Sequence, residues 1–384
     1  MTKKSDAPAI RFKGFSDAWE QRKLGDIASD MVAGGDIDKD LILAEGQYPV
    51  IANALTGDGI VGYYDKEYRV NAPAVTVTGR GDVGHAKARL VNFTPVVRLL
   101  SVKSEHDVFF LENAINTLKI VIESTGVPQL TVPQLAKYEV AFPRQLDEEE
   151  HIGAFFKQLD HLITLHQRKF EKLTNVKKSM LEKMFPQNGS SYPEIRFKGF
   201  TDPWEQRKAK ELFVSTADKG YPELPVLSAT QDRGMIRRDE NSINIFHDKK
   251  NEAGYKRVLP GQFVIHLRSF QGGFAHSAIE GITSPAYTVF GFSEPEKHNS
   301  EYWKYVFTSK SFIQRLETVT YGIRDGRSIS YEEFLTLGFV YPSKAEQTEI
   351  ARYLDKLSDL ITLHQRELEK LQNIKKSMLE KMFV

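Results

Sequence analysis

Two long stretches of the sequence place mostly apolar residues at alternating steps of three and four. The first series is Ile152, Phe156, Leu159, Ile163, His166, Phe170, Leu173, Lys177, Met180 and Met184, and the second is Ile350, Leu354, Leu357, Ile361, His364, Leu368, Leu371, Lys375, Met378 and Met382. This spacing, kept over about five heptads, predicts a helix with one apolar seam. Pro143 and Pro342 precede the two predicted helices and Pro186 follows the first, as helix boundaries require.

The two helices belong to a repeat that frames the whole chain. The block IRFKGFSDAWEQRK at 10–23 returns at 195–208 with two changes, and the block at 162–185 returns at 360–383 with four. The stretches between these blocks, 24–142 and 209–341, hardly resemble each other in sequence. A repeated frame predicts two halves packed about a pseudo-two-fold axis. We expect the two helices to pair, because each alone would expose its apolar seam. Antiparallel pairing suits the pseudo-two-fold arrangement.

The two variable inserts carry the signals of small α+β domains. In each insert a run of alternating residues, 74–78 and 263–268, follows a proline-containing turn and precedes a glycine-bearing loop, which predicts a strand and a loop. Later stretches, 108–122 and 299–318, have a helical pattern. The expected fold is therefore α+β, with two small mixed sheets joined by an antiparallel pair of long helices.

The seam histidines His166 and His364 occupy equivalent positions of the two helices. Their simplest role is that of polar seam residues that help to set the register of the pair. Metal binding or pH sensing is the alternative.

Composition narrows the class of protein without revealing a partner. The chain has 52 Lys and Arg against 51 Asp and Glu, so its net charge of +1 gives no global sign of a charged partner. No cysteine is present, which excludes disulfides, thiolate metal sites and cysteine nucleophiles. The sequence has no apolar stretch of signal-peptide or membrane-spanning length, so we expect a cytoplasmic protein without a membrane partner.

The search for catalytic motifs finds one partial match. Gly79-Arg80-Gly81-Asp82-Val83-Gly84 fits the dinucleotide-binding pattern, and Glu105 follows at the expected distance. The next residues, HAKARLVNFTP, alternate and reach a proline, so no helix N-terminus is predicted to receive a pyrophosphate. We therefore interpret 79–84 as a hairpin or recognition loop. Nucleotide-binding P-loops, zinc-protease motifs and serine-hydrolase elbows are absent from the sequence, which predicts a chain without catalytic activity of its own.

The predicted loops of both inserts are rich in arginine, amide and tyrosine side chains. Arginine, glutamine and asparagine can make paired hydrogen bonds to guanine or adenine, whereas lysine and tyrosine suit phosphates. The candidates for DNA contact are Asn53, Tyr63, Arg80, His85, Lys87 and Arg89 in the first insert, and Gln231, Arg233, Arg237, Arg268, Ser269, Gln271, His276, Arg324 and Arg327 in the second. Ordinary surface loops are the alternative for any one of them.

Over essentially its full length the chain resembles the DNA-specificity subunits of type I restriction-modification systems. The resemblance rests on the two blocks IRFKGF-x-D-x-W-E-Q-R-K, on the two helix ends KKSMLEKMF, and on insert phrases such as YPVIAN, GIVGYYD and IHLRSFQGGFAHS. Two such repeats in the same order make the resemblance highly specific.

The resemblance implies a division of labour along the chain. Residues 1–142 and 194–341 would be target-recognition domains, 143–185 and 342–384 paired coiled-coil helices, and 186–193 a linker. Each recognition domain would read one half of a bipartite, asymmetric site on double-stranded DNA. The helices would set the distance between the half-sites and dock two methyltransferase subunits.

The resemblance also implies where the chemistry is carried out. This chain would hold no cofactor, because S-adenosylmethionine would bind the methyltransferase subunits, and ATP and Mg²⁺ would bind separate restriction subunits. Two other readings of the residues stay open: a coiled-coil scaffold whose two heads bind proteins, and a nucleotide-binding enzyme.

Overall fold

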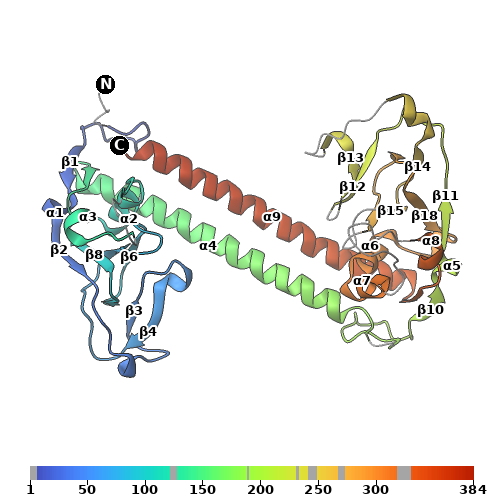
Figure 1. Cartoon of the computed structure of the whole chain (residues 1–384), viewed down its shortest axis with the longest axis horizontal. Coiled ribbons are helices and arrows are strands. Elements are labelled where there is room, and N and C mark those ends of the chain that lie inside the picture. The colour runs from blue at the N-terminus through green and yellow to red at the C-terminus, as the bar shows by residue number, and fades with distance from the viewer. Residues whose placement is uncertain are drawn as a thin grey trace. The chain divides into compact units, whose positions relative to one another are not determined.

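The computed structural model divides the chain into two compact units. It describes residues 7–121, 128–187, 190–230, 233–240, 249–266, 273–317 and 330–384. The first unit comprises Met1–Arg168 with His364–Val384, and the second comprises Lys169–Leu363. Each unit therefore holds one insert with the repeated block before it, together called a head below, and part of both long helices, α4 (Leu146–Lys183) and α9 (Lys344–Met382) (Figure 1). Each compact unit contains parts of both long helices, so the units do not coincide with the predicted division into heads and helices. That division stays a prediction.

The head of the first unit is built on a four-stranded antiparallel sheet with α2 (Val108–Asn116) packed against it. The strand order is β2 (Ala28–Ala33), β8 (Leu99–Ser104), β5 (Ala74–Thr78) and β6 (Ala86–Arg89). All of β5 is buried: Val75 and Val77 join the core that includes α2, and Ala74 joins a second cluster around Phe93. The other elements are β1 (Glu20–Lys23), α1 (Leu24–Ile27), β3 (Tyr48–Ile51), β4 (Ile60–Tyr64), β7 (Thr94–Pro95), α3 (Val132–Leu135) and β9 (Glu139–Phe142).

The head of the second unit repeats this plan, although the two inserts hardly resemble each other in sequence. Its sheet has the order β11 (Phe213–Thr216), β18 (Thr288–Phe292), β15 (Phe263–Ile265) and β16 (Phe274–His276). These four strands take the places of β2, β8, β5 and β6. The other elements are β10 (Glu205–Lys208), α5 (Ala209–Leu212), β12 (Leu227–Thr230), β13 (Gly234–Arg237), β14 (Lys256–Val258), β17 (Gly281–Thr283), α6 (Ser300–Thr308), α7 (Lys310–Glu317), α8 (Tyr331–Phe334) and β19 (Gly338–Tyr341).

The predicted elements of the heads are confirmed with changed lengths. The strand at 74–78 is β5, whereas β15 ends at Ile265. The helical stretch 108–122 yields α2, which ends at Asn116, and 299–318 yields two helices. Ser309 separates these two helices, because its hydroxyl accepts a hydrogen bond from Phe312 N and so starts a new helix. The α+β fold class is confirmed.

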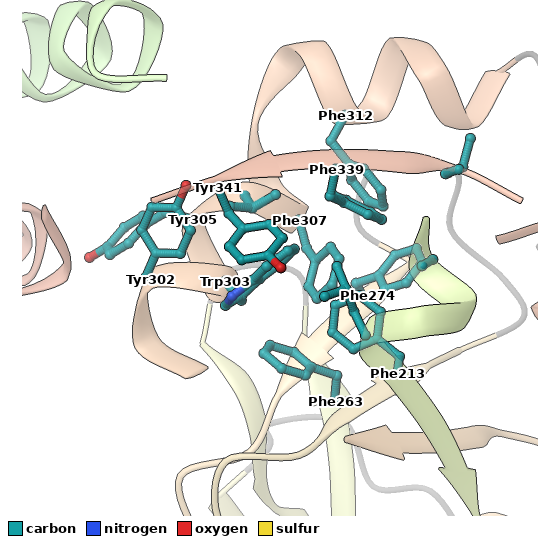
Figure 2. Packing of buried hydrophobic residues seen from close by; sticks show 14 of the residues in the cluster. Phe213, Phe263, Phe274, Tyr302, Trp303, Tyr305, Phe307, Phe312, Phe339 and Tyr341 are labelled. Atoms are coloured by element: carbon teal, nitrogen blue, oxygen red, sulfur yellow. The ribbon is translucent and has the colours of Figure 1, made fainter. Parts of the chain in front are cut away.

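Aromatic side chains fill the core of the second unit (Figure 2). The Phe213 ring centroid lies 5.2 Å from that of Trp303 and 5.7 Å from that of Phe307. Phe274 stacks on Phe307 with centroids 5.0 Å apart and also meets Phe312 edge-on. Because buried aromatic rings contribute large apolar areas, this cluster fixes the sheet against α6 and α7.

In both units the repeated block packs on the C-terminal end of a long helix. Trp19 meets Phe383 after α9, and Trp204 meets Phe185 after α4, with centroids 6.3 and 6.5 Å apart. One backbone hydrogen bond is also repeated: Ile10 N donates to Lys381 O at 3.0 Å, and Ile195 N donates to Lys183 O at 2.9 Å. Each head therefore holds the end of the helix that belongs, in chain order, to the other half.

Contacts within the first unit show that α4 and α9 run antiparallel. Phe156 meets Phe383, Asp160 binds Lys375 at 2.6 Å, and His166 contacts His364. The residue number rises along α4 as it falls along α9, which defines the direction of the pair. Every predicted seam position is buried or half-buried: Phe156, Leu159, Leu354 and Leu357 lie in cores, and Ile163, His166, Phe170, Leu173, Met180, Ile361, His364, Leu368, Leu371 and Met378 are half-buried.

Candidate nucleic-acid interface

The glycine-rich loop of the first head is the turn of a β-hairpin. Strands β5 and β6 pair antiparallel, with Val77 opposite Ala86, so the prediction of a hairpin is confirmed. Thr78 organises the turn: its hydroxyl donates to Asp82 O and accepts from His85 N at 2.9 Å, while its carbonyl accepts from Gly84 N at 2.8 Å. The strand after the loop leaves no helix N-terminus there for a phosphate.

Two glycines of this loop meet steric demands of the fold. A Cβ at Gly79 would clash with the Arg98 carbonyl, so only glycine allows the two backbones to approach. Gly84 has φ +90° and lies against the Ile120 side chain. These demands account for Gly79 and Gly84 without a bound nucleotide.

Arg80 is the candidate that the loop exposes most clearly. Its backbone forms a bridge with Gln129, and Leu130 N donates to Gly79 O at 2.9 Å. The Arg80 side chain is exposed and makes no hydrogen bond or ion pair with any residue that the structure describes. Its guanidinium can therefore bind a partner without breaking an internal contact. The neighbouring Gln129 was not predicted, because nothing in the sequence pairs 129 with 80.

Two further candidates of the first head contact other parts of the same head. The amide of Asn53 is occupied within the protein: Nδ2 donates to Val97 O at 3.1 Å and Oδ1 accepts from Gly79 N at 2.9 Å. Asn53 therefore braces the loop, and its contact with a base stays a prediction. Tyr63 lies half-buried on β4 of the second small sheet, with its backbone paired to Leu43.

His85, Lys87 and Arg89 line one cavity of about 80 Å³ beside Asp58. Arg89 donates from Nε to the Thr76 hydroxyl at 3.0 Å and from Nη1 to Asp58 O at 2.9 Å, and burial lowers its pKa. Lys87 Nζ is 3.8 Å from the Asp58 carboxylate and exposed. Desolvation lowers the pKa of His85, which favours the neutral ring at pH 7. Lys87 can thus reach a phosphate, whereas Arg89 serves the hairpin.

In the second head, six candidates lie outside the described residues: Gln231, Arg268, Ser269, Gln271, Arg324 and Arg327. Arg233 is exposed at the turn between β12 and β13. Arg237 is exposed too, with Nε 3.8 Å from the Asp239 carboxylate. Both can contact a ligand on the surface.

The prediction for His276 is wrong, because the side chain is only 8% exposed. Its ring lies 5.2 Å from the Phe263 ring, and its Nδ1 is 3.8 Å from the Glu301 carboxylate. Burial lowers its pKa. His276 is a core residue of β16 and cannot reach a base.

Sequence reasoning missed the ion pairs that attach the repeated blocks to the helices. Arg11 holds the buried Glu148 with two hydrogen bonds of 2.8 and 2.7 Å, and Arg196 holds the buried Glu346 with two of 2.7 and 2.8 Å. The carboxylates raise the pKa of both arginines. The signal was present, because all four residues stand at equivalent positions of the repeat. The heads are therefore mounted on the helices by the same contact.

Among the described residues, no helix combines the length and apolar character needed to cross a membrane. Nor do three or more potential metal ligands of the His, Asp or Glu type come together in that part of the chain.

Comparison with known proteins places these features in context. A family model described as the type I restriction modification DNA specificity domain matches residues 16–175. A putative type I specificity subunit of Mycoplasma pneumoniae is 30% identical over 145 residues, which cover 36% of this chain and only 39% of that protein. The specificity subunit of the type I restriction enzyme MjaVIII of Methanocaldococcus jannaschii is 23% identical over 392 residues, covering 94% of this chain and 91% of that one.

A solved structure shares the fold over nearly the whole chain. The crystal structure of the S subunit of a type I restriction-modification system from M. genitalium superposes with a TM-score of 0.66. The match covers 98% of this chain and 99% of that one at 13% sequence identity.

Proposed function

Because this chain belongs to the family of type I restriction-modification DNA specificity proteins, we propose that it selects the DNA target of such a complex. Each head reads one half of a bipartite, asymmetric site on double-stranded DNA. The chain itself is non-catalytic.

The observation that carries this proposal is the contrast between scaffold and loops. The two heads share the strand order of their main sheets and the arginine–glutamate pair that mounts them. The inserts that supply their loops, 24–142 and 209–341, hardly resemble each other in sequence. One scaffold that presents two sets of loops suits two different DNA half-sites, because direct readout depends on the side chains that reach the base edges.

The exposed cations of the loops suit DNA. Arg80 in the first head and Arg233 in the second can each make paired hydrogen bonds to a guanine, while Lys87 and Arg237 suit phosphates. Contacts to phosphates supply a large part of the affinity and make binding depend on salt. The arginine and amide candidates at 231, 268, 271, 324 and 327 belong to the same proposal.

The helix pair sets the spacing of the half-sites and docks two methyltransferase subunits. Its antiparallel register supports this role, because an antiparallel pair of equivalent helices offers the same surface twice. S-adenosylmethionine belongs to the methyltransferase subunits, and ATP with Mg²⁺ belongs to separate restriction subunits.

The test uses the complete complex in a host and maps methylated adenines in its DNA. The Arg80→Ala variant should relax one half of the methylated motif, and Arg233→Ala should relax the other half, because each bidentate contact contributes about 1–3 kcal/mol of discrimination. The Lys13→Ala variant is the control, since Lys13 is exposed on the repeated block. If both arginine variants changed the same half of the motif, the assignment of one half-site to each head would be wrong.

A further inference from the structure

Two histidines face each other across the helix pair. His166 on α4 and His364 on α9 are equivalent positions of the repeat, and both belong to the first unit. Their ring centroids are 5.1 Å apart at an interplanar angle of 65°, and their Nδ1 atoms are 3.1 Å apart. Each ring therefore presents the same atom to the other.

In a hydrogen bond between two Nδ1 atoms one imidazole donates its N–H and the other accepts with its lone pair, so the accepting ring is neutral. For both Nδ1 atoms to bind a metal ion, the donor ring must carry its proton on Nε2 instead. A neutral imidazole nitrogen with a lone pair is also the form that binds a metal ion. The protein has thus placed two potential ligand atoms side by side in a seam whose other positions are mostly apolar.

The distance between the two atoms fits coordination of one ion. Nitrogen binds zinc at about 2.0–2.1 Å, and two nitrogens at that distance from one ion and 3.1 Å from each other subtend an angle of about 98° at the ion. This angle lies between the roughly 90° of square-planar or octahedral sites and the roughly 109° of tetrahedral ones. Small rotations of the two rings can direct both lone pairs to a common point.

The ligand atoms define the kind of ion. Hard cations such as Mg²⁺ or Ca²⁺ prefer oxygen ligands, whereas imidazole nitrogens suit late transition metal ions. No third His, Asp or Glu joins the pair among the residues that the structure describes. Both rings are only half-buried, which leaves room for water ligands.

We propose that His166 and His364 form a binding site for one divalent late transition metal ion, of the class of Ni²⁺, Cu²⁺ and Zn²⁺. Imidazole suits these ions, and two protein ligands with water in the remaining positions satisfy their preferred geometries. The bound ion links α4 to α9 within the first unit. Because the unfolded chain does not hold the two rings together, binding stabilises the folded helix pair. The proposal does not depend on DNA binding by the heads.

The test measures metal uptake by the full chain after treatment with a chelator. Titration calorimetry with Ni²⁺ should give one site per chain, and saturating Ni²⁺ should raise the Tm. The His166→Asn and His364→Asn variants should each lose both effects. Asparagine is tolerated at single seam positions of coiled coils, so these variants are expected to fold. His161→Asn is the matched control, because His161 is exposed on the same helix and should leave uptake unchanged.

A spectroscopic measurement on the unaltered protein removes any dependence on how the variants fold. One equivalent of Cu²⁺ should give an electron paramagnetic resonance spectrum with coupling to two imidazole nitrogens. Coupling to one nitrogen or none would overturn the site. Uptake that survives His166→Asn, or that His161→Asn removes equally, would also overturn it, and absence of saturable uptake would leave the two rings as a pair that only shares a proton.

Discussion

The two halves of the molecule attach their heads to the long helices by the same ion pair. They differ in the contact that joins the long helix to the short helix of the head, which is α2 in the first half and α6 in the second. Arg11–Glu148 and Arg196–Glu346 are equivalent bidentate ion pairs. The next residue differs: Glu149 in the first half and Gln347 in the second. The arginine–glutamate pair is thus repeated in both halves, whereas the contact of the next residue differs between the two inserts.

In the first half this neighbouring contact is charged. Glu149 is fully buried, and its carboxylate accepts from His106 Nδ1 at 2.9 and 3.0 Å and from Asp107 N at 3.3 Å. Arg22 Nη1 lies 3.4 Å from the other ring nitrogen of His106. Gly153 allows α4 to approach, because a Cβ there would clash with the Asp107 carboxylate that caps α2. This network ties α2 to α4 through a buried charge.

In the second half the same place is neutral. Gln347 accepts from Asn299 N at 2.9 Å and donates to Pro342 O at 2.8 Å, and Asn299 caps α6. His298 precedes that cap as His106 precedes Asp107, but its buried Nδ1 has no hydrogen-bond partner among the described residues. Its ring instead stacks on Phe292 with centroids 4.6 Å apart. The comparison shows that the histidine at this position is hydrogen-bonded to a buried glutamate in the first half, whereas in the second half its Nδ1 has no partner among the described residues.

The largest loss of stability should come from breaking the arginine–glutamate pair, which occurs once in each half. Arg11→Ala and Arg196→Ala each leave a buried glutamate without its partner, which costs about 3–5 kcal/mol. Each variant should destabilise its own unit by a similar amount, as measured by hydrogen–deuterium exchange of the two units. Lys13→Ala and Lys198→Ala are controls, because these exposed lysines stand at equivalent positions of the repeat. Clearly unequal losses would show that the two ion pairs are not equivalent in energy.

Substitution of the histidine before each cap should destabilise the two halves to different extents. His106→Phe removes the partner of the buried Glu149 carboxylate and should cost about 1–3 kcal/mol in the first unit. His298→Phe removes a ring nitrogen that has no hydrogen-bond partner and keeps the stack on Phe292, so the second unit should change by less than about 0.5 kcal/mol. Urea unfolding with exchange readout for each unit measures both. Equal losses in the two variants would show that the hydrogen-bonded His106 and the stacked His298 contribute equally to stability.

Local patterns made much of the architecture predictable. Heptad spacing located α4 and α9, and the alternation at 74–78 located β5, because helix and strand periodicities are set by residues close in sequence. The shared plan of the two heads could not be predicted, since it depends on how short strands pair across long loops. The ion pair between Arg11 and Glu148 joins residues that are 137 positions apart in the sequence. Only a search for charged residues common to both copies of the repeat could have suggested it and its counterpart.

The candidate site was less predictable than the fold for a physical reason. Asn53 and His276 have side chains that suit DNA, but the fold uses one to brace a loop and buries the other. Arg80, in contrast, follows a buried strand and precedes Gly81, which has φ +79°. Residue chemistry shows what a side chain can bind, whereas its exposure depends on tertiary packing.

The smallest effect concerns acidification. Burial lowers the pKa of His276 and His298 in the second unit, so the unfolded state binds more protons than the folded state below the ordinary histidine pKa. Stability supplied by these neutral rings is present above that pKa and is lost as the pH falls through it. In the first unit His85 acts in the same direction, but burial raises the pKa of Asp107 and Glu112, which gain protons on folding and therefore oppose the loss.

Lowering the pH from about 7.5 to about 5.5 should therefore weaken the second unit more than the first. Hydrogen–deuterium exchange at both pH values, corrected for the intrinsic exchange rates, measures the change in each unit. His298→Phe should reduce the loss in the second unit, because one of its two titrating rings is gone, and should leave the first unit unchanged. If the first unit lost as much stability as the second, or if His298→Phe left the pH dependence intact, the difference between the halves would not reside in their buried histidines.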